Sequence, residues 1–248
     1  EICACLVGSE MCIRDSNGTN EKVKLQITCP DQSCYTYLIS DRGAYDTFPL
    51  TAGNGSYALQ VLENVAGDTY TVSLAQSINV SIEDEFLPFL YPNQYVNFHT
   101  DSKAVSKGSD LAKDTYSDLD VVQNIYNYVI KNISYDTEKA QNVSYGYVPD
   151  IDDTLSSKKG ICFDYAALMT SMLRSQNIPT KLEVGYSGDA YHAWISTYID
   201  DKGWVDDIIQ FNGNTWQIMD PTLAATNDSA AVKKYVGDGS HYVVKYTY

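Results

Sequence analysis

The stretch Gly160-Ile161-Cys162-Phe163-Asp164-Tyr165-Ala166 decides the fold of the C-terminal half of the chain. Apolar residues recur after it at helical spacing, so the sequence predicts a helix over about 161–176 that begins near Cys162. Asn177 can cap this helix, and Pro179 prevents its continuation. A thiol in the first turn lies near unpaired main-chain N–H groups and the positive end of the helix dipole, and both favour the thiolate.

Two strings further along the chain carry groups that could activate such a thiol. His192 lies in Tyr191-His192-Ala193-Trp194, at the start of a predicted strand, and Asp220 lies in Met219-Asp220-Pro221-Thr222, at the end of another. An imidazole can take the proton of a thiol, and a carboxylate can fix the tautomer of that imidazole. The residues in combination therefore predict a Cys-His-Asp site.

Each of these residues alone has a simpler interpretation. Cys162 could be a small buried side chain. His192 could be an imidazole with one hydrogen bond at the edge of the core. Asp220, followed by Pro, could belong to a turn that ends a strand. The prediction of a catalytic site therefore depends on the three occurring together.

The pattern around these residues predicts an α+β domain. A helix is expected to begin after Ser117, and the helix at Cys162 is followed by predicted strands at 181–186, 192–199, 215–219 and 242–246. The stretch 136–159 has no clear period and is interpreted as a long surface loop. Its acidic residues at 150–153 lack the ligand spacing of an EF-hand, and we expect neither a metal nor a cofactor.

The N-terminal part of the chain has a different pattern. Residues 23–27, 57–62 and 69–74 alternate apolar and polar side chains, with turn signals between them. We therefore predict a small β-sandwich of the immunoglobulin-like kind over residues 17–85, followed by a second domain over 86–248. Residues 1–16 resemble a translated sequencing adapter and are predicted not to be native protein.

The chain has six cysteines, of which Cys29, Cys34 and Cys162 lie outside the first sixteen residues. Cys29 and Cys34 flank a turn-like stretch. They could close a small disulfide loop in an oxidising compartment, or they could be unpaired cysteines in neighbouring strands. Cys162 is left without a disulfide partner in both cases, which is compatible with a reactive thiol.

Composition and charge exclude some classes of protein. With 248 residues and 44% hydrophobic side chains, the chain can form a packed core. Its net charge of −15 argues against nucleic acid as a partner, because phosphates would be repelled. No apolar run approaches the roughly 18 residues that a transmembrane helix needs, so no membrane span is predicted.

The motifs together resemble the core of the transglutaminase-like superfamily. The resemblance covers about residues 118–222 and is nearest to bacterial members, which resemble papain in fold. It rests on the following strings and residues: Gly160 to Ala166, Leu173-Arg174-Ser175-Gln176-Asn177-Ile178-Pro179, His192-Ala193-Trp194, Trp216 and Asp220-Pro221-Thr222. The resemblance implies a papain-like core, a helix that bears the cysteine packed on an antiparallel sheet.

The resemblance also implies roles for individual residues. Cys162 would be the nucleophile, His192 the general base and acid, and Asp220 the carboxylate that orients the imidazole. Tyr135 matches a family position near the site and is a candidate for binding the oxyanion, and Trp194 is a candidate for the wall of the cleft. Sequence features that match the calcium sites and extra domains of animal cross-linking enzymes are not apparent.

The expected reaction is acyl transfer on an amide through a thioester on Cys162, with water or an amine as the acceptor. This would make the chain a cysteine protease, an amidase or an acyltransferase, with a protein or peptide substrate, cell-wall peptide among the candidates. Arylamine acetyltransferases share the triad, so a small-molecule acyl donor is a further alternative. The alternative from another class is a non-catalytic cell-surface binding module with a structural triad. The resemblance and the β-domain predict an extracellular or cell-envelope location.

Overall fold

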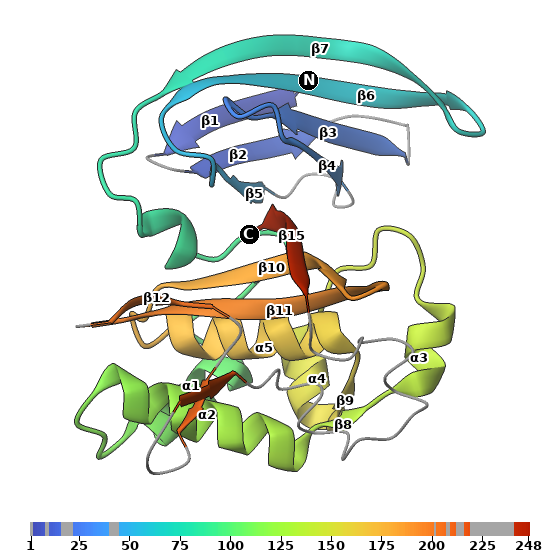
Figure 1. The fold of residues 1–248 in the computed structure, drawn as a ribbon. Coiled ribbons are helices and arrows are strands. Elements are labelled where there is room, and N and C mark those ends of the chain that lie inside the picture. The colour runs from blue at the N-terminus through green and yellow to red at the C-terminus, as the bar shows by residue number, and fades with distance from the viewer. Residues whose placement is uncertain are drawn as a thin grey trace. The chain divides into compact units, whose positions relative to one another are not determined.

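The computed structural model describes residues 2–7, 10–15, 22–39, 45–200, 202–206, 209–211, 216–218 and 241–248. The chain divides into two compact units, Glu1–Pro88 and Phe89–Tyr248 (Figure 1). Strands form the first unit, and helices and an antiparallel sheet form the second. The predicted α+β class is confirmed.

The first unit contains two antiparallel sheets. One sheet has the order β4-β3-β6-β7 and the other has the order β1-β2-β5. Their bounds are β1 (Ile2–Val7), β2 (Glu10–Asp15), β3 (Val23–Thr28), β4 (Cys34–Ile39), β5 (Asp46–Pro49), β6 (Gly55–Ala66) and β7 (Thr69–Val80). Buried and half-buried residues alternate along β3, as expected for a strand with one face in a core.

Aromatic contacts join the two sheets. The ring centroids of Tyr37 in β4 and Phe48 in β5 lie 4.7 Å apart. Met11, opposite Phe48 in the β2–β5 ladder, is only 2% exposed. The unit is therefore a small sandwich, whereas its immunoglobulin-like character stays a prediction. The prediction that residues 1–16 are not native protein concerns their origin, and the pairing of β1 and β2 does not decide it.

Cys29 and Cys34 do not form a disulfide, since both thiols are free. Cys34 lies opposite Thr28, the last residue of β3, and Cys29 directly follows Thr28. Side chains at adjacent ladder positions point to opposite faces of a sheet, and accordingly Cys29 is buried whereas Cys34 is exposed. The disulfide alternative is wrong, and the two residues are unpaired cysteines of a hairpin.

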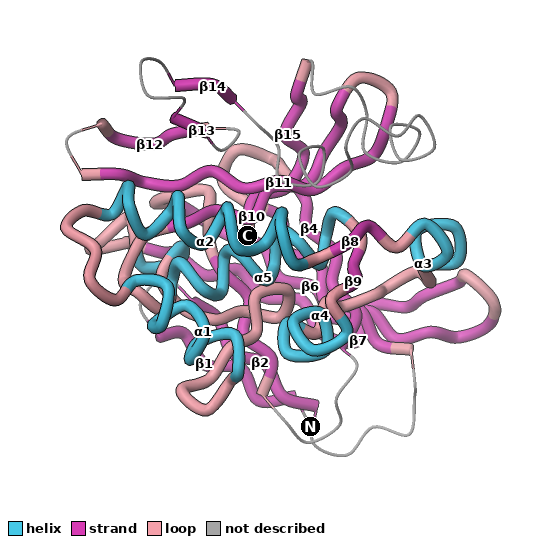
Figure 2. Tube along the Cα trace, turned by 90° about the horizontal axis from the view of Figure 1, so that it is seen from below, coloured by secondary structure: helices cyan, strands magenta, loops and turns pink. Residues whose placement is uncertain are grey.

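The second unit has three layers. Its sheet has the order β12-β11-β10-β15, formed by β10 (Thr180–Ser187), β11 (Ala190–Ile199), β12 (Gly203–Val205) and β15 (Tyr242–Thr247). Helix α5 (Cys162–Arg174) contacts β10 and β11 on one side. On its other side it contacts α1 (Lys103–Ala112), α2 (Asp118–Asn132) and α4 (Ile151–Ser157) (Figures 1 and 2).

Short elements complete the second unit. They are η1 (Leu87–Phe89) at the boundary between the units, β8 (Ser134–Tyr135), α3 (Thr137–Asn142), β9 (Lys159–Gly160), and the hairpin of β13 (Ile209–Phe211) and β14 (Trp216–Ile218). Strands β10, β11, β14 and β15 lie where the sequence predicts them. The cap of α2 is also as predicted, because Ser117 Oγ accepts a hydrogen bond from the Asp120 N–H at 3.2 Å.

Helix α5 is the central element of the second unit. Its residues from Asp164 to Arg174 are all buried, whereas Cys162 and Phe163 in its first turn are half-buried. Beyond the helix, Asn177 adopts a left-handed φ of 63°, and the Ile178 N–H bonds to the Leu173 carbonyl at 3.1 Å. The helix therefore ends where the sequence predicts, in the conformation that Asn tolerates better than most residues.

The prediction of a long loop over 136–159 is wrong, because this stretch forms α3, α4 and β9. Asp136 caps α3 by accepting a hydrogen bond from the Lys139 N–H at 2.9 Å. Asp150 caps α4 by accepting from the N–H groups of Asp152 at 3.0 Å and Asp153 at 2.9 Å. The acidic run thus begins a helix, where carboxylates favour the N-terminus.

Candidate active site

Cys162 is the first residue of α5, directly after Ile161, whose backbone is extended. Its thiol is free and half-buried. A helix start directs main-chain N–H groups outward. The thiol therefore occupies the kind of site in which a cysteine becomes a nucleophile: partly exposed, at the positive end of a helix dipole.

A short parallel pair of strands holds the chain just before Cys162. Tyr135 in β8 lies opposite Gly160 in β9, and the Asp136 N–H bonds to the Gly160 carbonyl at 2.9 Å. The hydroxyl of Tyr165 in α5 donates to the Ile133 carbonyl at 2.7 Å, just before β8. Tyr135, predicted as a neighbour of the site, therefore lies beside Gly160, two positions before Cys162.

Asp164, two residues after Cys162, is the centre of a buried hydrogen-bond network. Its side chain is fully buried. It accepts hydrogen bonds from the Ile161 N–H at 2.8 Å, from Lys139 Nζ at 2.7 Å and from the Tyr147 hydroxyl at 2.5 Å. Three donors, one of them an ammonium, offset the cost of burying a carboxylate. No role was predicted for Asp164 from the sequence, although an acidic residue three positions after the N-cap residue, here Ile161, is a capping signal.

The network changes the acidity of Tyr147 and restricts the side chain at position 160. Burial and then the hydrogen bond to Asp164 raise the pKa of the Tyr147 hydroxyl far above its ordinary value of 10.0. This hydroxyl therefore stays protonated and remains a donor. Gly160 is also fixed by the network, because a Cβ at this position would lie 2.7 Å from Asp164 Cβ. The carboxylate thus holds the start of α5 to the segment that includes α3 and Tyr147.

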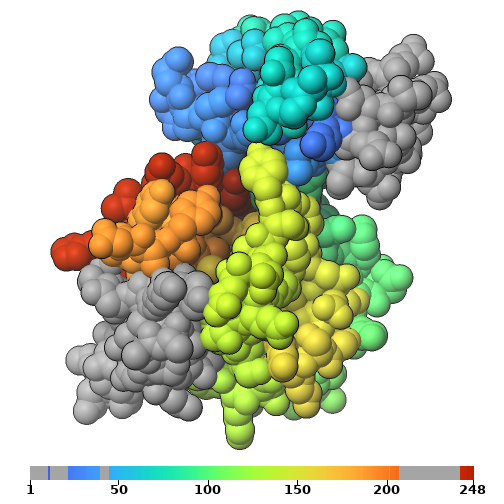
Figure 3. Space-filling view, turned by 90° about the vertical axis from the view of Figure 1, so that its right-hand side faces the viewer, coloured from blue at the N-terminus to red at the C-terminus, as the bar shows by residue number. Residues whose placement is uncertain are grey.

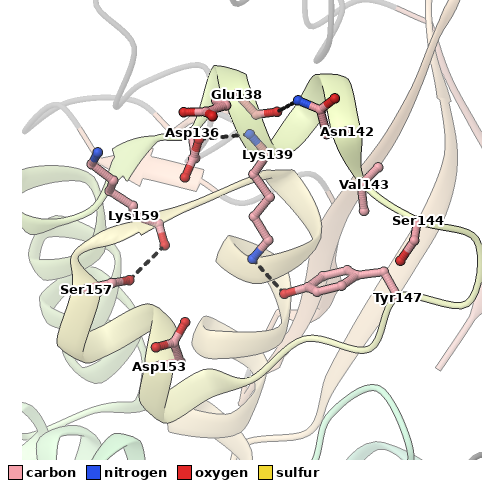
Figure 4. A pocket seen from close by; sticks show the side chains of 10 residues that line it. All are labelled: Asp136, Glu138, Lys139, Asn142, Val143, Ser144, Tyr147, Asp153, Ser157 and Lys159. Atoms are coloured by element: carbon pink, nitrogen blue, oxygen red, sulfur yellow. Dashed lines mark hydrogen bonds between the residues drawn. The ribbon is translucent and has the colours of Figure 1, made fainter.

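A cavity of about 680 Å³ borders this network (Figure 4). Its lining residues are Asp136, Glu138, Lys139, Asn142, Val143, Ser144, Tyr147, Asp153, Ser157 and Lys159. Lys139 and Tyr147 therefore face the cavity and bond Asp164. Cys162 is not among the lining residues, so this cavity is not the immediate surroundings of the thiol.

His192 lies near the start of β11 and is only 1% exposed. Its neighbour on the same face of the strand, Trp194, is 2% exposed, and the two ring centroids lie 6.0 Å apart. The Trp194 ring contacts Tyr242 of β15 at 4.8 Å. Gly185, opposite His192 in the ladder, allows the close approach of β15, because a Cβ there would collide with the Val243 carbonyl oxygen. Trp194 is therefore a core aromatic beside His192.

Electrostatics link the start of α5 with the start of β11. Burial is the main cause that raises the pKa of Tyr191, and the hydroxyls of Tyr246 and Tyr186 and then the Cys162 thiol raise it further. Tyr191 directly precedes His192. The string around Cys162 and the string around His192, thirty residues apart in sequence, thus lie in one neighbourhood of the fold.

Asp220 lies outside the described residues. Trp216 is the first residue of β14, and the structure describes only the main chain of this strand. The assembly of Cys162, His192 and Asp220 into a triad therefore stays a prediction. Over the described ranges, no group of three or more His, Cys, Asp or Glu side chains is placed to hold a metal ion. No described helix is long and apolar enough to cross a membrane.

Comparison with known proteins identifies the second unit. Residues 106–206 match the family model of the transglutaminase-like superfamily. Residues 106–206 therefore form a transglutaminase-like domain, as the motifs predict.

Two curated relatives match part of the chain. The UPF0252 protein MJ1282 of Methanocaldococcus jannaschii is 30% identical over 118 residues, which are 41% of this chain and 34% of that protein. The Kyphoscoliosis peptidase of Mus musculus is 30% identical over 107 residues, 38% of this chain and 16% of that protein. The chain thus spans about a third and about a sixth of the length of these relatives. A candidate cysteine protease from Cytophaga hutchinsonii is 14% identical, with a TM-score of 0.42 over 86% of this chain and 74% of that one.

Proposed function

We propose that the second unit is an enzyme that transfers the acyl group of an amide through a thioester on Cys162. The observation that carries this proposal is the position of the thiol, which lies half-buried in the first turn of a helix whose residues from Asp164 to Arg174 are all buried. A structural cysteine would be expected inside the core, as the rest of α5 is. The match of residues 106–206 to the transglutaminase-like superfamily supports the same reaction class.

The first step is attack of the Cys162 thiolate on the amide carbonyl carbon. A C–S bond forms, and the electron pair of the C=O bond moves to the oxygen, which becomes an oxyanion. Main-chain N–H groups at the start of α5 would stabilise this charge, because they point toward the position where it develops. Tyr135, held beside Gly160, is a second candidate donor.

The second step is collapse of the tetrahedral intermediate. The C–N bond breaks, and the amine leaves with a proton that the His192 imidazolium donates. His192 would have received that proton from the thiol, and Asp220 would hold the imidazole in the required tautomer. Water then attacks the thioester in hydrolysis or deamidation, and an amine attacks it in transamidation.

We propose a protein or peptide as the substrate, with peptides of the cell wall among the candidates, and an extracellular or cell-envelope location. The name of the Mus musculus relative, a peptidase, supports peptide hydrolysis for this chain. The chain's net charge of −15 makes a strongly acidic substrate unfavourable.

The test is intact-mass spectrometry of the protein with a library of glutamine-containing peptides, with and without an added primary amine. Wild-type protein should form an acyl adduct on Cys162, and the Cys162→Ala variant should form none. A gain of one mass unit on glutamine indicates deamidation, cleavage indicates proteolysis, and an amine adduct indicates transamidation. The proposal is wrong if wild type and Cys162→Ala modify the peptides equally, or if iodoacetamide at pH 6 labels both to the same extent.

A further inference from the structure

A group of aromatic side chains gathers around the start of α5, and we name it the tyrosine strip. Its members come from separate parts of the second unit and are Tyr95, Tyr145, Phe163, Tyr186, Tyr191 and Tyr246. Tyr145 is 76% exposed and Tyr191 is 56% exposed, and the other members are half-buried. Exposed aromatic rings that cluster on one face mark a binding surface more often than chance exposure does.

Ring contacts join members of the strip in pairs, and one pair includes the residue next to Cys162. Phe163 directly follows Cys162, and its ring centroid lies 5.3 Å from that of Tyr95. On the other side, the ring of Tyr191 lies 5.5 Å from that of Tyr186 in the β10–β11 hairpin. Both distances are those of aromatic pairs in contact.

The hydroxyl groups of the strip also influence one another. Burial raises the pKa of Tyr95 to about 12, and the hydroxyls of Tyr145, Tyr191 and Tyr246 add to the shift. Tyr191 in turn is within the electrostatic influence of the Cys162 thiol. Figure 3 shows one face of the second unit, with the hairpin of β10 and β11 in orange, β15 in red, and the segment around α3 in yellow-green.

The chemistry of the strip indicates what it binds. Tyrosine rings provide flat apolar faces that lose little entropy on binding, and their hydroxyls can bond the main chain of a ligand. Aromatic-lined surfaces bind extended proline-rich segments, and aromatic side chains of a ligand can pack against such rings. Acidic ligands are disfavoured by the net charge of −15.

We infer that the tyrosine strip is the subsite for the residues that flank the reacting amide, and that the substrate is a peptide with proline or aromatic side chains beside that amide. This inference rests on the proposed function, since an amide in a polypeptide has amino-acid residues on both sides. The strip would hold the segment extended across the start of α5, with the carbonyl carbon at Cys162.

The test compares peptides with the same glutamine core and three kinds of flanking residue: Trp or Pro, Ala, and Glu. Binding is measured on the Cys162→Ala variant, and turnover is measured on proteins that retain Cys162. The Trp and Pro peptides should bind most tightly. Tyr145→Ala and Tyr191→Ala should each weaken that binding roughly 2- to 12-fold, since an aromatic contact contributes about 0.5–1.5 kcal/mol. In turnover this loss should appear in KM rather than kcat.

Tyr116→Ala is the matched control. Tyr116 is 98% exposed and lies between α1 and α2, at the opposite end of α2 from β8. Its replacement should change neither binding nor turnover. A loss of affinity in Tyr116→Ala equal to that of Tyr191→Ala would overturn the inference.

The outcomes separate this inference from the proposed function. Selective binding of the Trp and Pro peptides without turnover supports the strip and contradicts the proposed function. Turnover that is equal for the Ala and Trp peptides supports the function and overturns the strip. Stronger binding of a sugar-linked peptide than of the same peptide without sugar also overturns the inference, because the rings would then bind a glycan. Failure of all peptides to bind or react overturns both.

Discussion

The two ends of α5 each carry a buried charge, and the comparison of the two separates the structural from the functional part of this helix. Asp164 in the first turn is fully buried, and Arg174 in the last turn is 3% exposed. Each charge has the sign that the helix dipole favours at its end. Each side chain also makes three hydrogen bonds.

The partners differ in kind. Arg174 donates to main-chain oxygens: Thr180 at 2.9 Å, Tyr91 at 2.7 Å and Tyr248 at 2.7 Å. It therefore joins the end of α5 to β10 and to the chain at Tyr91 and Tyr248. Asp164 instead takes two of its three hydrogen bonds from side chains, those of Lys139 and Tyr147. The C-terminal end is thus built into the main-chain framework, whereas the end with the thiol depends on a side-chain network.

Replacement of Arg174 should have the largest effect on stability. In Arg174→Met the three main-chain oxygens lose a charged donor inside the core. Hydrogen bonds to charged groups contribute about 1.5–3 kcal/mol each. Because Arg174→Met also removes the cost of burying the guanidinium, the net loss should be less than the sum of three such bonds, roughly 3–5 kcal/mol of unfolding free energy. Urea unfolding measures this loss. Iodoacetamide labelling of Cys162 in the protein that remains folded should keep its wild-type rate.

Arg174→Lys is the control. Lysine keeps the positive charge but lacks the planar guanidinium that donates to three acceptors at once. It should recover only part of the lost stability. Full recovery would mean that the charge alone matters. A fall in turnover of folded Arg174→Lys as large as that expected for Asp164→Asn would remove the distinction between the two ends.

Replacement of Asp164 should have a smaller effect on stability and a larger effect on reactivity. Asp164→Asn removes the charge that pairs with Lys139, and we expect a loss of roughly 2–3 kcal/mol. Because the start of α5 is then less well held, turnover should fall about tenfold or more while the protein stays folded. Calorimetry and the peptide assay measure the two effects.

A double-mutant cycle with Lys139→Met sharpens this prediction. The two residues are in contact at 2.7 Å, so their effects should be non-additive by about 1 kcal/mol or more. Asp110→Asn is the matched control, since Asp110 pairs with Lys107 at 3.8 Å and its side chain is 71% exposed. This surface pair should contribute less than about 1 kcal/mol. Additive effects of Asp164→Asn and Lys139→Met would show that the network does not act as a unit.

The same comparison shows which features the sequence could predict. Both ends of α5 were predictable because they are local: Cys162 follows a Gly-containing string, and Asn177 and Pro179 follow the apolar stripe. Strands β10, β11 and β15 were predictable from their position after this helix. These features depend on residues that are close in sequence.

The network around Asp164 could not be predicted, since its members are far apart in sequence. Lys139 lies 25 positions from Asp164, and Tyr147 lies 17 positions from it. The helix that bears Lys139, α3, buries none of its residues, so it leaves no apolar period in the sequence. Only the capping residues Asp136 and Asp150 signalled helices in a stretch that was interpreted as a loop.

Gly160→Ala tests how closely the start of α5 fits its carboxylate. The added Cβ would lie 2.7 Å from Asp164 Cβ, so either Asp164 or the main chain of β9 must move. Overpacking of this kind costs about 1–3 kcal/mol. We expect this loss in thermal unfolding, together with a changed labelling rate of Cys162. An alanine that leaves both unchanged would show that the fit at Gly160 does not position the thiol.

Glu183 provides the smallest and last test, as a buried carboxylate outside α5. It is 7% exposed, and Ser196 Oγ donates to it at 2.6 Å. Burial raises its pKa above the ordinary value of 4.5, and the Ser196 hydrogen bond and Lys181 lower it by less. The folded protein therefore binds this proton more tightly than the unfolded chain does. Stability should then fall as the pH rises from about 4.5 through the raised pKa, and this contribution should be constant above it.

Glu183→Gln should remove this dependence, because an amide oxygen can still accept from Ser196 but cannot ionise. The difference in Tm between the variant and wild type should be constant below pH 4.5 and should shift in favour of the variant as the pH rises. Ser196→Ala should extend the sloping region to higher pH, because it removes a group that lowers the pKa of Glu183. Parallel Tm profiles for wild type and Glu183→Gln would show that this carboxylate is solvated well enough to ionise freely. A carboxylate in this unit could then ionise with fewer donors than Asp164 has. The three donors of Asp164 would not be needed for its charge alone, and their role would be to position the thiol.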